Sequence, residues 1–203
     1  MFKQKLQLPT TEQALADNPE PIPADQNHLI YQRPLNSTDA HEQSIVFGMG
    51  CFWGVERLFW QLAGVTNTAV GYAGGITADP NYEQVCSGLT GHAEVVKVSF
   101  DPTLISLDKL LHVFWHEHDP SQGMRQGNDI GSAYRSAIYC NTQQLALVQQ
   151  SKQDFSQKLI TIDHQTITTE IKQQQVFYFA EDYHQQYLHK HPDGYCNLRG
   201  ITF

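Results

Sequence analysis

The stretch that decides the fold reads SIVFGMGCFWG and covers residues 44–54. Its first part, residues 44–48, is a short apolar run of the kind that forms a buried β-strand. Apolar side chains then recur at spacings of three and four, which predicts an amphipathic helix that ends near Gly64. The side chains with this spacing are Phe52, Val55, Phe59 and Leu62. Cys51 therefore lies where a strand passes into a helix.

Strand and helix patterns continue along the rest of the chain. Apolar or alternating runs predict strands at residues 65–72, 92–100 and 134–139, with further β structure at 167–171 and 176–179. Helical spacing predicts helices at 107–115, with Ser106 as N-cap, at 142–159, and in a short segment between 181 and 190. The first six elements run strand, helix, strand, strand, helix, strand. This order is typical of an α+β fold with a ferredoxin-like βαββαβ two-layer core, in which helices cover one face of a mainly antiparallel sheet.

Two segments fall outside this pattern. Residues 1–43 contain five prolines among polar side chains and show no sustained periodicity. We therefore expect an irregular N-terminal arm that is either extended over the domain or partly disordered. Residues 44–203 form the main domain, which includes a Gly-rich loop at 119–132. After Pro192 we expect a mobile C-terminal tail.

Composition narrows the class of protein. The formal net charge is −8 and the basic residues form no cluster, which argues against a nucleic acid or an anionic membrane as the main partner. No run approaches eighteen apolar residues, and the N-terminus lacks the apolar stretch of a secretory signal. We therefore expect a soluble cytoplasmic protein and a monomer. The four cysteines include no C-x-x-C pair, which argues against a zinc ribbon or a thioredoxin-type motif. Four cysteines could form two structural disulfides, but in a chain of this size without a signal peptide we expect free or redox-active thiols.

Cys51 is the first residue expected to carry chemistry. The unpaired N–H groups and the positive dipole end of a helix N-terminus favour an anion, so a thiol there is expected to lose its proton easily and to act as a nucleophile. The alternative is an inert, buried cysteine. Phe52 belongs to the apolar stripe of the helix. Trp53 lies off that stripe and is placed to form the wall of an apolar pocket beside the sulfur.

Glu94 is the second such residue. The alternation of the strand at 92–100 gives Glu94 the same face as Val96, Val98 and Phe100, which points a carboxyl group toward the core. Apolar surroundings raise the pKa of a carboxyl group, which then holds a proton near neutral pH and can act as a general acid. An edge position or a buried ion pair would explain the same pattern.

Several further residues are candidates on weaker grounds. Tyr82, Asp129 and Tyr134 are possible hydrogen-bond donors or orienting groups, although most tyrosines are simply packed. The run HEHD at 116–119 resembles a set of metal ligands, but consecutive helical side chains point in different directions. We therefore expect no metal site and no cofactor.

The remaining cysteines differ in their surroundings. Cys196 lies in the tail between two glycines, where it could move toward Cys51 and condense with a sulfenic acid to form a disulfide. Cys86, near a probable turn, and Cys140, at the end of a strand, are expected to be passive.

Two other functions remain open on these residues. A cysteine hydrolase of acyl groups would need a histidine as the base for Cys51, whereas a core-facing Glu94 fits acid catalysis better. A non-catalytic domain would either bind methionine-containing peptides or sense peroxide through Cys51 and Cys196. A sensor needs neither an apolar pocket beside the sulfur nor a proton donor, so Trp53 and Glu94 argue against it.

The motifs together resemble those of the A-type peptide methionine sulfoxide reductases. They are GCFWG at 50–54, GYAGG at 71–75, TGHAE at 90–94, HDP at 118–120, GMRQGND at 123–129, YRS at 134–136 and AEDYHQQYL at 180–188. This ordered set covers about residues 44–196 without large gaps. The resemblance implies a βαββαβ core, in agreement with the predicted order of elements, and makes residues 44–203 the catalytic domain.

The resemblance also implies the parts of the first chemical step. Cys51 would attack the sulfur of methionine sulfoxide, and Glu94 would protonate the sulfoxide oxygen. Phe52 and Trp53 would form the pocket that receives the methyl group of the substrate. A sulfoxide oxygen is a poor leaving group, so attack on sulfur gains from proton donation and from oriented hydroxyl groups.

The rest of the cycle follows from the same resemblance. Tyr82 and Tyr134 would bind the sulfoxide oxygen, and Asp129 would help to organise the site. Cys51, left as a sulfenic acid, would form a disulfide with Cys196 that thioredoxin reduces. Some relatives carry a further C-terminal cysteine, but none follows Cys196 here, so the expected cycle uses two cysteines. The implied substrate is the S epimer of methionine sulfoxide, free or in proteins, and the implied purpose is repair of oxidative damage.

Overall fold

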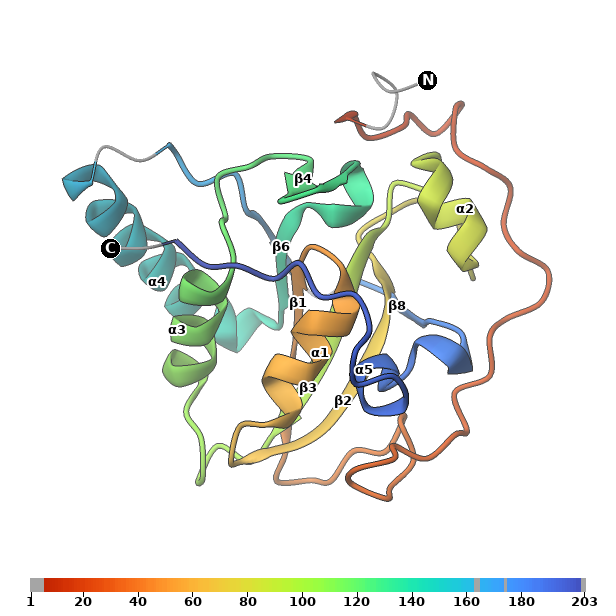
Figure 1. The fold of residues 1–203 in the computed structure, drawn as a ribbon, viewed down its shortest axis with the longest axis horizontal. Helices are drawn as coiled ribbons and strands as arrows, with labels where there is room; N and C mark the ends of the chain where they lie inside the picture. The colour runs from red at the N-terminus through yellow and green to blue at the C-terminus, as the bar shows by residue number, and fades with distance from the viewer. Residues whose placement is uncertain (1–5, 163–164, 174, 202–203) are drawn as a thin grey trace.

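The computed structural model describes residues 6–162, 165–173 and 175–201. Residues 1–5 of the expected arm and residues 202–203 of the expected domain therefore lie outside the described residues. A six-stranded sheet with the order β7-β6-β1-β3-β2-β8 forms the centre of the molecule, and helices pack against it (Figure 1). A mixed α and β architecture is thus confirmed.

Antiparallel pairing dominates the sheet. Strand β1 (Gln43–Met49) pairs with β3 (Ala93–Phe100) on one side and with β6 (Ser136–Cys140) on the other. Strand β2 (Val65–Ala73) pairs with the far side of β3. Two short edge strands complete the sheet: β8 (Phe177–Phe179) runs antiparallel to β2, and β7 (Glu170–Gln173) runs parallel to β6.

Three helices share one apolar core with one face of the sheet. They are α1 (Phe52–Trp60), α3 (Leu107–Glu117) and α4 (Thr142–Thr161). Phe47 of β1 joins two of them, because its ring stacks on Phe59 of α1 at 5.0 Å and on Phe114 of α3 at 5.1 Å. Among the described residues, no helix combines the length and the apolar character that a membrane span requires.

The structure departs from the sequence prediction at several short elements. Helix α2 (Tyr82–Ser87) was not predicted, because six residues are too few for a helical period and only the Asn81 capping box marks its start. The Gly-rich loop contains a hairpin of β4 (Arg125–Gln126) and β5 (Asp129–Ile130), followed by the 3₁₀ turn η2 (Ser132–Tyr134). The strand expected from residue 134 therefore begins two residues later.

The helix expected between residues 181 and 190 is divided in two. A 3₁₀ turn, η3 (Asp182–His184), is followed by α5 (Tyr187–Lys190). Gln186 lies between them with φ of +47°, a left-handed conformation that ends one helical segment before the next can begin.

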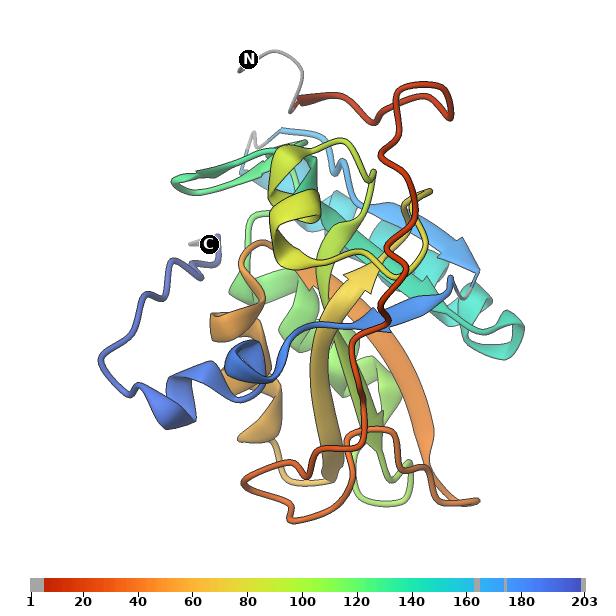
Figure 2. The same cartoon turned by 90° about the vertical axis from the view of Figure 1, so that its right-hand side faces the viewer.

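The N-terminal arm is extended and lies against the domain along the side that carries α2, β8 and α5 (Figure 2). Backbone and side-chain hydrogen bonds hold it at several points. The N–H of Leu15 donates to the carbonyl of Leu89 at 3.1 Å, and His28 Nε2 lies 2.8 Å from Thr68 Oγ1 of β2. His28 is fully buried, so the described part of the arm contributes to the interior of the molecule.

Candidate active site

A tight turn between β1 and α1 places Cys51 at the start of α1. Gly50 has φ of +92°, and a side chain at this position would approach Gln126 Cβ to 2.7 Å. Cys51 follows as the N-cap residue of α1 and is partly buried. The strand-to-helix position predicted for this thiol is therefore the one observed.

The environment of Cys51 does not lower its pKa as expected. Burial and the negative charge of Glu94 raise the pKa of the Cys51 thiol, and the backbone N–H of Trp53 opposes them. The helix N-terminus thus acts in the predicted direction, but the loss of solvent has the larger effect. Burial therefore opposes the easy ionisation that the sequence predicts for this thiol.

Glu94 lies on β3 with its carboxyl group turned into the core beside Cys51. Its side chain is 2% exposed, and its carboxylate accepts a hydrogen bond of 3.1 Å from the backbone N–H of Phe52. Burial raises the pKa of Glu94 to about 8, with a further contribution from the negative charge of Asp129. A carboxyl group with this pKa is mostly protonated at neutral pH and can donate its proton.

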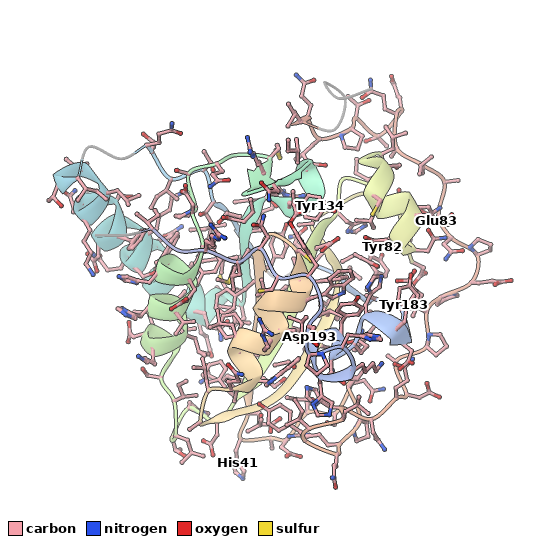
Figure 3. All side chains as sticks on the ribbon, in the orientation of Figure 1. His41, Tyr82, Glu83, Tyr134, Tyr183 and Asp193 are labelled. Carbon is pink, nitrogen blue, oxygen red and sulfur yellow. The ribbon has the colours of Figure 1, made fainter. Side chains whose placement is uncertain are left out.

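Two tyrosine hydroxyl groups lie near this acid. Tyr82 is the first residue of α2, and Tyr134 ends η2; Figure 3 shows both on the side of the molecule where α1 begins. Burial raises the pKa of each tyrosine, and the charge of Glu94 contributes in both cases. Both groups therefore remain neutral hydroxyls that can donate hydrogen bonds. The Tyr82 hydroxyl also bonds to Cys86, the cysteine expected to be passive.

Aromatic rings form a wall next to the nucleophile. The buried Phe52 ring lies 5.1 Å from the ring of His184, and the Trp53 ring stacks on Tyr187 at 3.9 Å. Trp53 Nε1–H donates to His184 Nδ1 at 3.0 Å, which fixes the direction of the indole. Tyr82 closes the group, with its ring 4.5 Å from His184. The Phe52 ring is 1% exposed, so the partly buried Trp53 is the more accessible of the two rings predicted to line a methyl pocket.

His184 and Tyr187 were not identified from the sequence. Both lie in the AEDYHQQYL motif that contributed to the family resemblance. No pattern in that motif indicates a contact with Trp53, which lies 131 residues before His184 in the chain. Burial lowers the pKa of His184 to about 4, so the imidazole is neutral and can accept the indole hydrogen.

The C-terminal tail is seated over the site. The Tyr195 hydroxyl donates to the carboxylate of Asp129 on β5, at 3.1 and 3.2 Å from its two oxygens. Asn197 Nδ2 donates to the carbonyl of Gln126, and Leu198 packs against the main core. These contacts tie down a segment that the sequence predicted to be mobile. They also place Cys196 beside α1, since a methyl group on Gly54 would approach Cys196 Sγ to 2.7 Å.

The four cysteines are present as thiols. Cys140 is 1% exposed at the end of β6, in line with a packing role. Cys86 lines a cavity of about 350 Å³ together with Asp129 and Tyr134, which brings it closer to the site than the sequence suggested. The groups whose charges raise the pKa of Cys51 are Glu94, Asp129 and Cys196.

The possible metal-ligating side chains of the described residues do not form an ion site. Within residues 6–162, 165–173 and 175–201, no three His, Cys, Asp or Glu side chains are placed to hold an ion. In the HEHD run, both nitrogens of the buried His118 already have partners: Nδ1 lies 2.7 Å from the carbonyl of Phe114 and Nε2 lies 2.8 Å from Ser136 Oγ. The chemistry available here is that of a thiol, a neutral acid and hydroxyl donors.

Comparisons with known proteins agree with this chemistry. The family model described as peptide methionine sulfoxide reductase matches residues 43–202. A relative from Brucella anthropi, a peptide methionine sulfoxide reductase MsrA, is 54% identical over 98% of this chain and 92% of its own length.

Solved structures show the same likeness. Methionine sulfoxide reductase A of Corynebacterium diphtheriae has a TM-score of 0.85 and 40% identity, over 94% of this chain and 93% of that one. The reduced form of Mxr1 from Saccharomyces cerevisiae has a TM-score of 0.73 and 32% identity, over 81% of this chain and 96% of that one. Mxr1 has also been solved in complex with Trx2, where the identity of 22% and the TM-score of 0.55 indicate a common fold.

Proposed function

Because the chain belongs to the peptide methionine sulfoxide reductase family, we propose that it reduces methionine sulfoxide with Cys51 as nucleophile and Glu94 as acid. The observation that carries this assignment is the hydrogen bond from the Phe52 N–H to the Glu94 carboxyl group. It holds a buried acid, with its pKa raised to about 8, against the residue that follows the nucleophile. A proton donor and a thiol are therefore positioned by the same turn.

In the first step, the methyl group of the substrate packs against Phe52 and Trp53, and the sulfoxide oxygen faces Glu94. Cys51 Sγ forms a bond to the substrate sulfur, while Glu94 transfers its proton to the oxygen. The Cys51 thiol gives up its own proton in this step, and the ionised Glu94 is the nearest base to receive it. The hydroxyl then passes to the cysteine sulfur as methionine leaves, so Cys51 becomes a sulfenic acid and the substrate sulfur is reduced.

The hydroxyl groups and the acid at the edge of the site assist this step. Tyr82 and Tyr134 remain neutral and can donate to the developing negative charge on the oxygen, which is worth most in a site from which water is excluded. Asp129 holds the tail over the site through the Tyr195 hydroxyl. These roles rest on the positions of the side chains around Glu94.

In the second step, Cys196 condenses with the oxidised Cys51 to give a disulfide and water. The seat of Cys196 against α1 supports this pairing. We propose a thioredoxin as the reductant that reopens the disulfide, in keeping with the family and with the complex of yeast Mxr1 and Trx2. The substrate is the S epimer, free or within oxidised proteins, and the reaction repairs oxidative damage.

Three broader features belong to the same proposal. The strand order β6-β1-β3-β2, antiparallel throughout, supports a ferredoxin-like core. Residues 44–203 act as the catalytic domain, with residues 1–43 as an arm that packs on it. We propose the cytoplasm as the compartment, where the thiols of the cycle are kept reduced.

The test is methionine release from separate S and R epimers of N-acetylmethionine sulfoxide with dithiothreitol, for the wild type and Cys51→Ser. We expect product from the S epimer alone and none from the variant. Product from the variant would remove Cys51 from its role. A Cys51–Cys196 disulfide formed with peroxide, with no methionine from either epimer, would indicate a sensor. Release of an acyl product without oxidation of cysteine would indicate a hydrolase.

A further inference from the structure

Gly54 occupies the point on α1 where the C-terminal tail comes closest to the helix. A methyl group built on Gly54 would lie 2.7 Å from Cys196 Sγ and 3.4 Å from Leu198 Cβ. Carbon and sulfur atoms that are not bonded do not approach this closely. The Cys196 thiol therefore fills the space that any side chain at residue 54 would need. Figure 1 shows the tail passing across the N-terminal half of α1.

The backbone of Gly54 does not require glycine. Gly54 is the third residue of α1 and is absent from the residues with positive φ, so its conformation is one that alanine adopts readily. Glycine is a poorer helix former than alanine at such a position. A glycine at residue 54 thus leaves space for the Cys196 thiol, and an alanine would fill that space.

The space left at Gly54 lies close to the nucleophile Cys51. Residues three apart in a helix share one face, with Cβ positions about 5–6 Å apart. Cys51 is the N-cap residue and Gly54 the third residue of α1, positions whose side chains face each other across the first turn, so a thiol seated on Gly54 lies within one helical turn of Cys51. The charge of Cys196 also acts on Cys51, which places the two sulfurs near each other.

We propose that Gly54 is a positioning residue for the second half of the reaction and that its missing side chain forms the seat from which Cys196 attacks. This inference rests on the proposed function. The Cys196 sulfur forms a bond to the sulfur of the Cys51 sulfenic acid, the S–O bond of that acid breaks, and the hydroxyl leaves as water with the Cys196 proton. The sulfenic sulfur is reduced and Cys196 is oxidised, so no further oxidant is needed.

Contacts on both sides of Cys196 keep the tail from simply moving aside. Before it, the Tyr195 hydroxyl is bonded to Asp129. After it, Asn197 is bonded to the carbonyl of Gln126, and Leu198 packs on the core. A side chain at residue 54 would therefore push the thiol out of its seat against these contacts.

The experiment compares Gly54→Ala with the wild type in a single turnover without added reductant. Methionine release reports the first step, and the loss of alkylatable thiol at Cys196, followed by mass spectrometry, reports disulfide formation. We expect methionine release at the wild-type rate and a disulfide step slower by roughly ten- to a hundredfold, because a displacement of about 1 Å at a reacting group has effects of this size. Gly54→Ser, with a longer side chain, should show the same pattern at least as strongly.

A double variant separates the seat from a general effect on α1. In the Cys196→Ser background, which forms no disulfide, Gly54→Ala should again leave the first-step rate unchanged, because the first step does not use the seat; a slower first step here would indicate a general effect on α1. Far-ultraviolet circular dichroism checks that α1 is retained. Disulfide formation at the wild-type rate in Gly54→Ala would overturn the proposal, as would an equal slowing of both steps. If the wild type itself released no methionine, the proposed function would fail instead.

Discussion

The carboxyl group of Glu94 and the thiol of Cys51 depend on the same turn of α1. The Phe52 N–H bonds to the carboxyl group, and the Trp53 N–H favours the thiolate. Burial raises the pKa of both groups, and Glu94 when ionised raises the pKa of Cys51 further, so a state with both groups ionised is unfavourable. The resting site therefore stores the proton that the sulfoxide oxygen needs, and the thiol ionises only as that proton is transferred.

The first prediction concerns the rate of the first step. Glu94→Gln keeps the shape of the side chain and an oxygen for the Phe52 N–H but has no proton to give. We expect methionine release in a single turnover to slow by about 10²- to 10⁴-fold, the usual contribution of a positioned acid. Rapid-quench measurement of methionine provides the rate. Glu83→Gln, at an exposed position of α2, is the matched control and should be unaffected. An unchanged rate in Glu94→Gln would exclude Glu94 as the acid.

The same substitution should stabilise the protein at alkaline pH. The folded-state pKa of Glu94 is about 8, above the 4.5 that is usual for a glutamate in an unfolded chain, so between these values the folded chain holds a proton that the unfolded chain releases. The stability of the wild type therefore falls as pH rises through this window. Gln cannot ionise and escapes the loss.

We expect Glu94→Gln to raise the free energy of unfolding by about 2–5 kcal/mol at pH 9, since one pKa unit corresponds to about 1.4 kcal/mol, and by little at pH 5. Urea unfolding at the two pH values measures the difference. The reverse pattern, with a gain at pH 5 that disappears at pH 9, would show that burial does not raise this pKa.

At the scale of elements, a buried carboxylate on α1 connects three distant segments. Glu56 is fully buried and accepts hydrogen bonds from the Gln186 N–H at 2.8 Å, from Gln186 Nε2 at 2.7 Å and from Thr68 Oγ1 at 3.1 Å. His28 of the arm bonds to the same Thr68 hydroxyl. Gln186 lies between η3 and α5, which carry His184 and Tyr187, the ring partners of Trp53. By holding Gln186 in place, Glu56 therefore supports the aromatic wall.

Removal of this carboxylate is the third prediction. Glu56→Ala leaves the two donors of Gln186 and the hydroxyl of Thr68 without their acceptor. We expect the free energy of unfolding at pH 7.5 to fall by about 2–4 kcal/mol, because each unsatisfied buried group costs about 1–3 kcal/mol and the burial cost of the carboxyl group is relieved in part. The KM for peptide substrate should also rise, since Trp53 loses its support. Urea unfolding and steady-state kinetics measure both, with Glu83→Ala as control. An unchanged free energy of unfolding and an unchanged KM would show that Glu56 stabilises neither the fold nor the aromatic wall.

The elements also show what a sequence can and cannot reveal. Helices α1 and α3 and strand β3 were predicted because each is long enough for its apolar spacing to repeat, and that spacing also turned Glu94 inward. Helix α2 and the β4-β5 hairpin are too short for such a pattern. The contacts of Trp53 with His184 and of Tyr195 with Asp129 join residues far apart in the chain, so no local signal marks them. Burial likewise decides the pKa of Cys51, and burial is a property of the whole fold.

At the scale of the whole molecule, both ends of the described chain close around α1. The arm reaches the Glu56 side of the helix through His28, and the tail reaches the Cys51 side at Gly54. The two contacts serve different parts of the cycle. In the proposed cycle, the arm supports the aromatic wall that receives the substrate, whereas the tail supplies the thiol that converts the sulfenic acid of Cys51 to a disulfide.

The last prediction tests whether the tail closes the cycle. In Cys196→Ser, the site around Cys51 and Glu94 is unaltered, so about one methionine per enzyme should be released at the wild-type rate. Turnover with thioredoxin should then be lost, because no disulfide forms, while dithiothreitol should still support turnover by reducing the sulfenic acid directly. Stopped turnover with both reductants would instead indicate a damaged site.

Undiminished turnover with thioredoxin in Cys196→Ser would transfer the resolving role to another thiol, and the structure says which one to examine. Cys140 is 1% exposed at the end of β6, where an approach to Cys51 would require the sheet to open. Cys86 lies on α2, bonded to the Tyr82 hydroxyl and lining the same cavity as Tyr134. In that case Cys86→Ser in the Cys196→Ser background should abolish the remaining turnover and Cys140→Ser should not, because only the first of these sulfurs lies beside the substrate oxygen's expected partners.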